Sequence, residues 1–511
     1  MTKIRPRALA LCAAFTIFIG LLIFWKIDRT PGLNADEAWT GLRAMDIQRD
    51  GLTSPHGMNW YTAPMHAAMV AKTFDILGTG TWQLRLPGAA INVIAAGIMA
   101  LFIAAVFGET AMLVFGGLLL VSPFYFLEAR IAWEVCALQN FLAAVMLWSA
   151  WRLFSDETPS TIALIAFIYA AAVGALNHLI FMALPIGFAA GFCAKAVRGD
   201  RRARFLAEAA AWATLCAGLL LLTKKHTSDT FWQAHRVFFT SLFIFAPVIS
   251  AALCLSTRKL TGRLWDSLSP ALARAGGKTG SFLIYAGLAA FIWFHATAFM
   301  GILSGFNMFK RFFSLDLGFA GAVPMFLWAA VIMGAVLSGA LAAFRSEDAE
   351  DRKLFAGCLM LGVTASFTML RNTNSARYYI VPFLVFAFAA AVFLPDYLRG
   401  MKRNGKIFMA LCALLPVFFS VREMQWPVQR RPFHFTQGWH DETSARMMDA
   451  SIMAEKARAE KTCVFAGDNF LVFPTEFHYR SRKWECVPAR RMVMEYCYDC
   501  ADPPYIRHHV E

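Results

Sequence analysis

Two adjacent carboxylates, Asp36 and Glu37, stand just beyond the first long apolar segment of the chain. Acidic residues are scarce in this sequence, with 34 Asp and Glu among 511 residues, of which 58% are hydrophobic. Acidic groups beside a bilayer are costly, so they indicate function more often than simple surface solvation. A carboxylate shielded from bulk water and within reach of a hydroxyl can act as a general base. Asp36 could equally cap the N-terminus of a helix, and the spacing alone leaves both roles open.

Other residues on the same side of the expected membrane could join this pair in one site. They are aromatic, basic or acidic residues that flank predicted apolar segments: Trp60, Tyr61, His66, Arg85, Arg130, Glu134, Lys225, Arg236, Arg377 and Tyr378. Basic residues on the outer side run against the usual charge bias of membrane proteins, which favours a functional cause. Each could also be an interfacial anchor, and Arg130 could simply pair with Glu134 on a helical turn. The pattern therefore predicts a polar site that gathers groups from several loops.

The elements that must hold these residues are predicted to be membrane-spanning helices. Long apolar runs recur from end to end, and only 16% of the residues are charged. A length of about 20 apolar residues per span predicts about thirteen helices in an all-α membrane fold, with interfacial helices in the first outer loop. The predicted spans are 8–26, 84–107, 110–127, 134–154, 161–176, 179–194, 205–223, 237–256, 281–303, 322–344, 354–370, 379–394 and 408–420.

The basic residues predict the orientation of these spans. The formal net charge is +14, but the basic residues form short clusters between apolar runs, which is typical of cytoplasmic loops and not of a nucleic-acid partner. The N-terminus is predicted to be cytoplasmic and the first helix to be retained, because its apolar run is too long for a signal peptide. The loop 27–83 and the tail then lie on the outer side, which in a bacterial inner (plasma) membrane is the periplasmic face.

The tail, residues 421–511, is predicted to form a small mixed α/β domain. The stretch 443–461 is typical of a helix, whereas 462–466 and 469–473 are typical of strands. The tail contains four cysteines, Cys463, Cys486, Cys497 and Cys500. An even number of cysteines on an oxidising side of the membrane favours disulfides, for which three pairings are possible. A zinc or redox site at Cys497 and Cys500 is the alternative.

Several short motifs over residues 1–420 together resemble one group of membrane enzymes. The motifs are Asp36-Glu37, Arg85-Leu86-Pro87, Ser122-Pro123-Phe124-Tyr125 with Arg130 and Glu134, and Ala376-Arg377-Tyr378-Tyr379-Ile380-Val381-Pro382. In this order they resemble the dolichyl-phosphate-mannose protein mannosyltransferases and the aminoarabinose transferases. These proteins are C-type glycosyltransferases, which are integral to the membrane. The resemblance implies a transmembrane glycosyltransferase domain over residues 1–420, with the loop 27–83 as its catalytic loop.

The resemblance also implies a reaction. A sugar would pass, with inversion, from a polyprenyl-phosphate donor to an envelope acceptor, which could be lipopolysaccharide, another glycan or a protein. Asp36 and Glu37 would be the catalytic acids of this motif, with Asp36 as the base and with Glu37 and Glu134 positioning substrate. No cofactor is implied with certainty, although an Asp-Glu pair could hold a divalent cation beside a phosphate.

The remaining residues would contact the two substrates. Arg236 and Arg377 would hold the donor phosphate, whose negative charge grows at the transition state, and Trp60 and Tyr61 would stack on sugar or lipid. The first loop departs from one branch of the group. It reads Trp60-Tyr61-Thr62-Ala63-Pro64-Met65 and lacks the Glu and Lys of the Tyr-x-Glu-Lys-Pro-Pro element of the aminoarabinose transferases. The sugar and the acceptor therefore stay unassigned.

Two other classes of protein would also have many spans. A transporter or lipid flippase tends to place ionisable residues near the bilayer midplane and to show internal repeats, whereas these charges cluster at the outer loops and no repeat relates the two halves. A non-catalytic scaffold built on a degenerate enzyme fold would have no need to retain Asp36 and Arg377. The residues therefore favour an enzyme.

Overall fold

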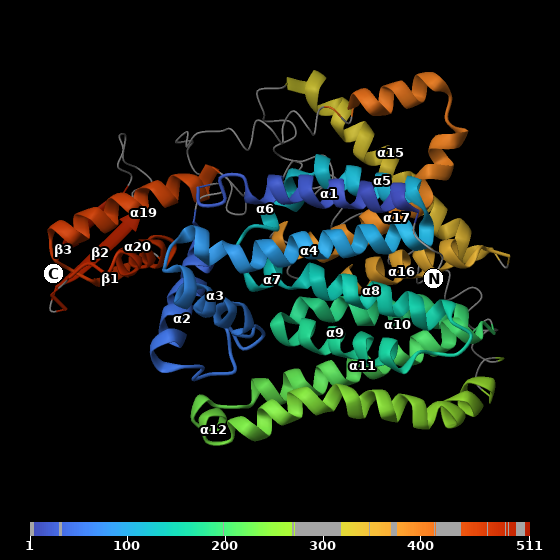
Figure 1. Cartoon of the computed structure of the whole chain (residues 1–511), viewed down its shortest axis with the longest axis horizontal. Coiled ribbons are helices and arrows are strands. Elements are labelled where there is room, and N and C mark those ends of the chain that lie inside the picture. Colours follow the sequence, from blue (N-terminus) through green and yellow to red (C-terminus); the bar gives the residue numbers. More distant parts are fainter. Residues whose placement is uncertain are drawn as a thin grey trace.

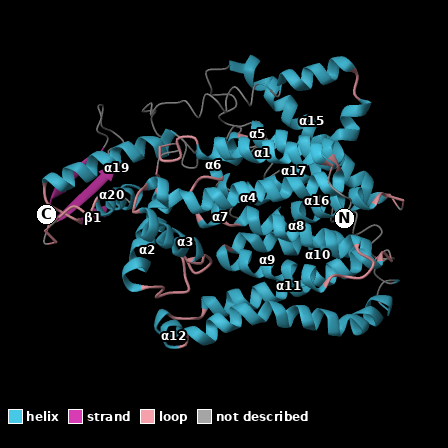
Figure 2. Cartoon of the chain, viewed as in Figure 1, coloured by secondary structure: helices cyan, strands magenta, loops and turns pink. Residues whose placement is uncertain are grey.

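The computed structural model describes residues 5–29, 33–197, 199–267, 318–346, 348–368, 376–412, 441–467, 469–485, 490–496 and 506–510, together with a few isolated positions. Helices dominate this part of the chain (Figure 2). The strands that it contains form one three-stranded sheet, and all of them come after residue 463.

The first half of the described chain is a succession of helices. They are α1 (Pro6–Phe24), α2 (Ala35–Asp50), α3 (Met65–Leu77), α4 (Thr81–Phe107), α5 (Glu109–Val121), α6 (Pro123–Glu128), α7 (Glu134–Ala137), α8 (Gln139–Ser155), α9 (Thr161–Asn177), the 3-10 turn η1 (Leu179–Met182), α10 (Ala183–Ala196), α11 (Arg201–Lys225) and α12 (Asp229–Ala234). A long helix, Arg236–Ser267, follows. The later helices are α15 (Gly318–Arg345), α16 (Asp351–Thr368), the 3-10 turn η2 (Ala376–Tyr379), α17 (Ile380–Gly400), α19 (Asp441–Ala459) and α20 (Asn469–Ser481).

The chain is a membrane protein of the all-α class. In the described ranges, seven helices are long and apolar enough to cross a membrane: Pro6–Phe24, Thr81–Phe107, Leu179–Ala196, Arg201–Lys225, Arg236–Ser267, Leu327–Arg345 and Ile380–Gly400. The apolar helices α5 and α9 are shorter. The expected span at 281–303 lies outside the described residues, as does most of the one at 408–420, so the number thirteen stays a prediction.

The long helices lie side by side in one bundle (Figure 1). Helix α17 is the most enclosed of the seven candidate spans, with 89% of its apolar window buried. Small residues let neighbouring helices approach closely. Gly187 and Gly191 of α10 face α16, where a Cβ on Gly187 would lie 2.8 Å from the Cα of Val363. Such small-residue contacts favour tight helix packing in a membrane, and here they fix the bundle that carries the outer loops.

Helix α2 begins at a capping box. The side-chain oxygen of Asn34 accepts a hydrogen bond from the N–H of Glu37 at 3.0 Å, and the Glu37 carboxylate accepts one from the N–H of Asn34 at 3.5 Å. This arrangement satisfies N–H groups that a helix start leaves unpaired. The N-cap is therefore Asn34, and the alternative that Asp36 caps this helix is wrong.

The hairpin of α9 and α10 breaks where the sequence predicts, at Asn177 and His178. His178 pairs with Thr62 of the first loop in an isolated antiparallel bridge. Two backbone hydrogen bonds flank that bridge, from Ala63 N–H to the Asn177 carbonyl (3.1 Å) and from Leu179 N–H to the Tyr61 carbonyl (3.0 Å). The first loop is therefore joined through its backbone to the end of the bundle.

The C-terminal segment contains both helices and strands. Strands β1 (Val464–Gly467), β2 (Arg491–Tyr496) and β3 (Ile506–Val510) form a sheet in that order, with β1 parallel and β3 antiparallel to β2. The strand expected over 469–473 is wrong, because these residues begin helix α20. In a helix, Leu471 can pack within the C-terminal segment while Phe477 packs against α2. In a strand, two residues six positions apart would lie on the same face and could not pack in these different directions.

Cys463, just before β1, is disulfide-bonded. The other three cysteines that the sequence singles out, Cys486, Cys497 and Cys500, lie outside the described residues.

Candidate active site

Glu37 forms a buried ion pair with Arg85. Arg85 donates from Nε to Oε1 of Glu37 at 2.8 Å and from Nη2 to Oε2 at 2.7 Å, and neither side chain is exposed. The N–H of Ala132 also donates to Oε1 at 2.7 Å, and Nη1 of Arg85 donates to the carbonyl of Ile27 at 2.7 Å. The pair thus joins α2 to α4, to the turn after α1 and to the segment before α7. The sequence predicts catalysis for Glu37 and substrate binding for Arg85, and in the structure both side chains are occupied by these contacts.

Arg130 binds the end of α1. Its Nη1 donates to the carbonyl of Trp25 at 2.8 Å, its Nη2 donates to the carbonyl of Leu22, and its Nε donates to that of Phe126 at 3.2 Å. Basic side chains commonly satisfy the last carbonyls of a helix in this way. Burial, and then the like charge of Arg85, lower the pKa of Arg130 to about 9. Arg130 therefore lies beside the ion pair and holds the exit of α1.

Asp36 is half-buried in the first turn of α2. Its carbonyl accepts a hydrogen bond from the Thr40 hydroxyl at 3.0 Å. Because Asn34 supplies the cap, the Asp36 carboxylate is not required for that purpose. The start of a helix favours a negative charge, so the position suits an ionised carboxylate.

His66, in the first turn of α3, is buried beside α4. Its Nε2 lies so near Gly88 that a Cβ on that glycine would be 3.3 Å from it. Within the part of the chain that the structure describes, neither ring nitrogen has a hydrogen-bond partner. Burial lowers the pKa of His66 to about 4, so the ring is neutral near pH 7.

A group of aromatic rings stands where the first loop meets the break between α9 and α10. The ring of Tyr61 lies 5.7 Å from that of Trp60 and 5.4 Å from that of His178, and the His178 ring lies 5.6 Å from that of Tyr378. The Nζ of Lys225 lies 4.9 Å from the Trp60 ring centre. These five residues are called the aromatic platform below. Trp60 is 42% exposed, so the platform offers an accessible ring and a cation.

Lys224, next to the platform, is buried and fixes the first loop. Its ammonium group donates to the carbonyl of Thr62 at 2.9 Å and to that of Leu176 at 3.0 Å. Glu134 lies near enough to attract the same charge. A buried ammonium group needs such acceptors, because leaving it without them would be costly. Lys224 therefore ties the loop that carries Trp60 and Tyr61 to the end of α9.

The segment 132–134 connects the start of α2 to the aromatic platform. Ala132 donates to Glu37 as described above, and the indole N–H of Trp133 donates to the Asn34 side chain at 2.9 Å. On the other side, the Asn177 side chain donates to the Glu134 carbonyl at 2.6 Å. One short segment thus contacts both the helix that carries Asp36 and the residue next to His178, which places the two groups of residues in one region.

The structure describes fewer contacts for the last two predicted cations, Arg236 and Arg377. Arg236 begins the helix Arg236–Ser267, and its side chain is exposed, with no ion pair to a described residue. Arg377 lies in η2 next to Tyr378, which brings its backbone to the aromatic platform, but its side chain lies outside the described part of the structure.

Metal binding has little support in the described ranges. They contain no group of three His, Cys, Asp or Glu residues that could hold a metal ion. Both oxygens of Glu37 already accept hydrogen bonds from Arg85. A divalent cation at the Asp36-Glu37 pair would share Glu37 with Arg85, and it stays a prediction.

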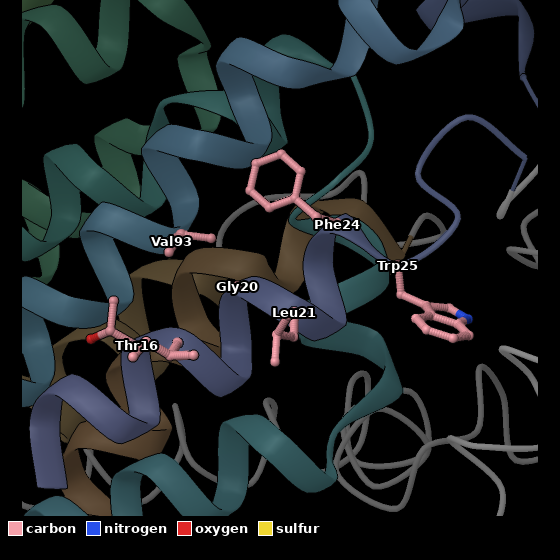
Figure 3. Close-up of a pocket in the computed structure, with 7 residues that line it drawn as sticks. Thr16, Gly20, Leu21, Phe24, Trp25 and Val93 are labelled. Carbon is pink, nitrogen blue, oxygen red and sulfur yellow. The ribbon is translucent and has the colours of Figure 1, made fainter.

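An open groove of about 540 Å³ runs between α1 and α4 (Figure 3). Its lining is almost entirely apolar: Thr16, Ile17, Gly20, Leu21, Phe24, Trp25 and Val93. The groove reaches Trp25, whose carbonyl accepts a hydrogen bond from Arg130. Such a surface suits a hydrocarbon chain.

Sequence reasoning missed the roles of three residues that organise the site. Asn34 is the N-cap, Lys224 fixes the first loop, and His178 joins the loop to the bundle. Signals for the first and third were present: Asn34 is followed three residues later by Glu37, as a capping box requires, and His178 stands at the predicted helix break. A buried role for Lys224 depends on tertiary contacts and leaves no local pattern.

The fold and the site together define a polytopic membrane protein with a half-buried acid at one end of its helical bundle. Comparison with solved structures gives this class a fold name. The chain is similar to an oligosaccharyltransferase of Archaeoglobus fulgidus in complex with zinc and sulfate, at 14% identity and a TM-score of 0.52, over 95% of this chain and 68% of that one. It is also similar to the archaeal oligosaccharyltransferase AglB in complex with an inhibitory peptide and a dolichol-phosphate, at 12% identity and a TM-score of 0.50, over 96% and 69%.

A further similarity is to ArnT of Cupriavidus metallidurans bound to undecaprenyl phosphate, at 15% identity and a TM-score of 0.40, over 95% of this chain and 92% of that one. No protein-family model and no curated protein matches this sequence. At these identities the likeness concerns the fold. The chain has the fold of the C-type membrane glycosyltransferases, which the sequence motifs predict.

Proposed function

We propose that this protein is a membrane glycosyltransferase that moves a sugar from a polyprenyl-phosphate donor to an envelope acceptor. The observation that carries this proposal is the position of the half-buried Asp36 in the first turn of α2. Asn34, and not the Asp36 carboxylate, caps this helix, and the buried ion pair of Glu37 and Arg85 gives the start of the helix a rigid support. These are the requirements for a general base that takes a proton from an incoming hydroxyl.

In this proposal the two neighbouring acids have different roles. Asp36 is the base, and Glu37 positions it by fixing α2 through Arg85. This revises the expectation that both acids take part in the chemistry. The anionic leaving phosphate needs nearby cations, because its charge increases in the transition state. Lys225 on the aromatic platform is one candidate, and Arg377 and Arg236 are the others.

The aromatic platform is the proposed sugar or headgroup site. An exposed indole ring such as that of Trp60 can stack on the apolar face of a sugar, and Lys225 beside it can pair with a phosphate. The known ligands of the structural neighbours fit this scheme: AglB was solved with a dolichol-phosphate and ArnT with undecaprenyl phosphate. We extend the same donor class, a lipid phosphate, to this chain.

The proposal includes a topology. The N-terminus and the basic loops lie in the cytoplasm of a bacterium, about thirteen helices cross its inner membrane, and the site lies on the periplasmic face. The segment 421–511 is then a small periplasmic domain of mixed α/β structure. The sugar, the acceptor and the inverting course of transfer belong to the same proposal.

The test is a comparison of Asp36→Asn with a matched control, Asp75→Asn. Asp75 is an exposed carboxylate of the same loop that contacts Gln48 and Lys72. Each variant is expressed in a strain that lacks the native gene, and envelope glycans and lipid-linked sugars are measured by mass spectrometry. We expect Asp36→Asn to lose the glycan product and to accumulate the lipid-linked sugar, whereas Asp75→Asn should behave as the native protein does.

Full product formation by a folded Asp36→Asn protein would refute the assignment of the base. A transporter or flippase would give another outcome. In proteoliposomes it would move the lipid-linked sugar across the bilayer without releasing polyprenyl phosphate, whereas the proposed enzyme releases it when acceptor is present.

A further inference from the structure

Helix α20 of the C-terminal segment packs directly on α2, the helix that carries Asp36 (Figure 1). The ring of Phe477 is fully buried among Leu42 of α2, Phe74 of α3 and their apolar neighbours. Gly41 faces this ring so closely that a Cβ there would overlap Cε2 and lie 2.6 Å from Cδ2. The absence of a side chain at position 41 therefore makes room for a residue more than 400 positions away in sequence.

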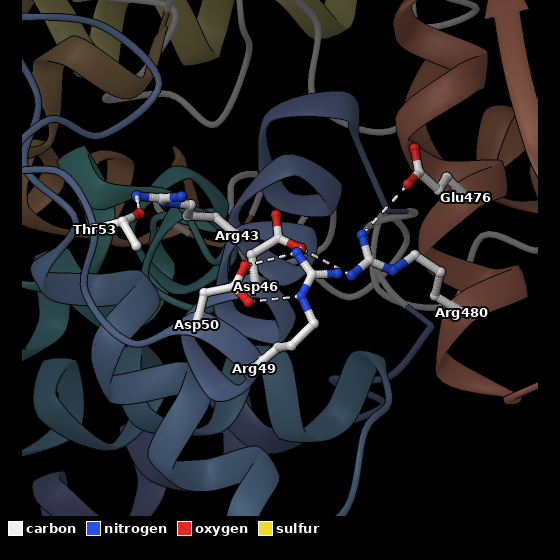
Figure 4. Close-up of polar contacts among 7 residues, drawn as sticks. All are labelled: Arg43, Asp46, Arg49, Asp50, Thr53, Glu476 and Arg480. Atoms are coloured by element: carbon white, nitrogen blue, oxygen red, sulfur yellow. Dashed lines mark hydrogen bonds and ion pairs between the residues drawn. The ribbon is translucent and has the colours of Figure 1, made fainter. Parts of the chain in front are cut away.

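Polar contacts reinforce this packing. Arg480 of α20 donates from Nη2 to Asp46 of α2 at 2.9 Å, and its Nη1 lies 3.4 Å from Glu476 on its own helix (Figure 4). The Thr79 hydroxyl, just after α3, donates to the carbonyl of Ser481 at 3.0 Å. Partial burial raises the pKa of Glu476, against the effect of Arg480. Two elements of the first loop are thus tied to one helix of the C-terminal segment.

Helix α2 is consequently held at two places. Its first turn is fixed by the Glu37 and Arg85 ion pair, and its middle is fixed by Phe477 against Gly41. Helix α2 also packs along α3, and the contact with Phe477 restricts the tilt of its axis further than α3 and the ion pair do alone. Asp36 lies one residue from the first point and five residues from Gly41, so its position depends on both.

We propose that α20 is a positioning element for Asp36, with Phe477 as the positioning residue and Arg480 as its polar support. This inference adds to the proposed function, on which its catalytic part rests. Phe477 does not contact substrate in this scheme. It keeps α2 in the one orientation in which Asp36 can reach the acceptor, and misplacing a catalytic group by about 1 Å can lower a rate strongly.

The test uses the full-length protein with Phe477→Ala, Phe477→Leu and Arg480→Gln. The matched control is Glu455→Gln, which loses a contact with Arg482 inside the C-terminal segment and leaves α2 untouched. Hydrogen exchange measured by mass spectrometry reports on α2 and, as an internal reference, on the residues of α19 around Met453 and Ala457. Undecaprenyl phosphate is the binding probe, and product formation is measured in the deletion strain.

We expect Phe477→Ala to increase exchange in α2 about tenfold while α19 keeps its protection, since Phe477 is not part of the core that holds α19. Product should fall about tenfold, with affinity for undecaprenyl phosphate changed by less than about twofold. Phe477→Leu should restore most of the product, Arg480→Gln should give a smaller effect in the same direction, and Glu455→Gln should change neither quantity.

Two results would overturn the inference. One is unchanged exchange in α2 of Phe477→Ala, and the other is a loosened α2 with normal product. The exchange measurement does not depend on the reaction. If Asp36→Asn retained its product, the proposed base would fail, but the exchange data would still report whether α20 holds α2.

Discussion

The buried ion pair of Glu37 and Arg85 allows a quantitative test of how the site is held. Glu37→Gln would leave the buried guanidinium group of Arg85 without the carboxylate that it contacts in the native protein, since both side chains have no exposed surface. Removing one partner of such a pair costs about 3–5 kcal/mol, because an uncompensated charge remains in a poorly solvated place. The N–H of Ala132, which donates to the same carboxylate, would keep an acceptor in the glutamine amide oxygen.

The double variant Glu37→Gln with Arg85→Gln separates this charge effect from other losses. It removes both charges, so it should be less destabilised than the sum of the two single variants by about 2 kcal/mol or more. The assay is equilibrium unfolding in mixed micelles during titration with a denaturing detergent, with helix content as the signal. The matched control is Asp156→Asn, which breaks a 2.8 Å pair with Arg152 whose side chains are 32% and 28% exposed.

The control should cost at most about 1 kcal/mol, because partly exposed pairs are screened by solvent. The reasoning fails if Glu37→Gln costs no more than Asp156→Asn, or if the two single changes simply add. In either case the pair would not fix α2, and Glu37 would again be a candidate for the chemistry itself.

Two further predictions concern other buried groups, which lie in the site and, for His478, in helix α20. Because His66 and His478 have pKa values of about 4 in the folded protein and about 6.5 when unfolded, the unfolded chain binds more protons between these values, and stability falls as pH decreases through that window. His66→Phe should weaken this acid sensitivity in unfolding measured at pH 7 and pH 5, and an unchanged slope would contradict the burial argument. Lys224→Met should release the loop around Thr62, with a loss of about 2–4 kcal/mol in the unfolding assay and faster proteolysis of residues 52–64, because two carbonyl groups lose their hydrogen bond from a charged donor. Lys72→Met, at an exposed lysine that contacts Asp75 of its own helix, serves as the control and should leave proteolysis of this loop unchanged.

The sequence predicts those parts of the molecule that depend on local pattern. Apolar runs of bilayer length gave helices close to the expected ranges, and the break at Asn177 and His178 was visible as two polar residues in an apolar stretch. The helix α19 follows from composition in the same way. The strand expected over 469–473 failed, because a short apolar run fits a strand or a helix equally well, and contact with α2 decides between them.

Roles within the site were harder to predict, because partners lie far apart in sequence. Arg85 is a suitable outer cation by every local criterion, yet its position opposite Glu37, 48 residues away, makes it a support for α2. Arg130 is predicted to pair with Glu134 or to bind substrate, whereas its described contacts are with the carbonyl groups at the end of α1. A sequence pattern identifies charged groups at the right depth. Only the tertiary contacts show which of them neutralise one another.

The geometry of a helix explains how two adjacent acids can have opposite roles. Successive residues of an α-helix project about 100° apart around its axis, so the side chains of Asp36 and Glu37 leave the helix in different directions. Glu37 faces inward, where Arg85 and the N–H of Ala132 meet its carboxylate, and it is fully buried. Asp36, which leaves the helix in another direction, keeps part of its surface exposed. An exchange of the two residues would place the longer side chain outward and leave Arg85 with a shorter partner, so the order of the pair is as important to the site as its charge.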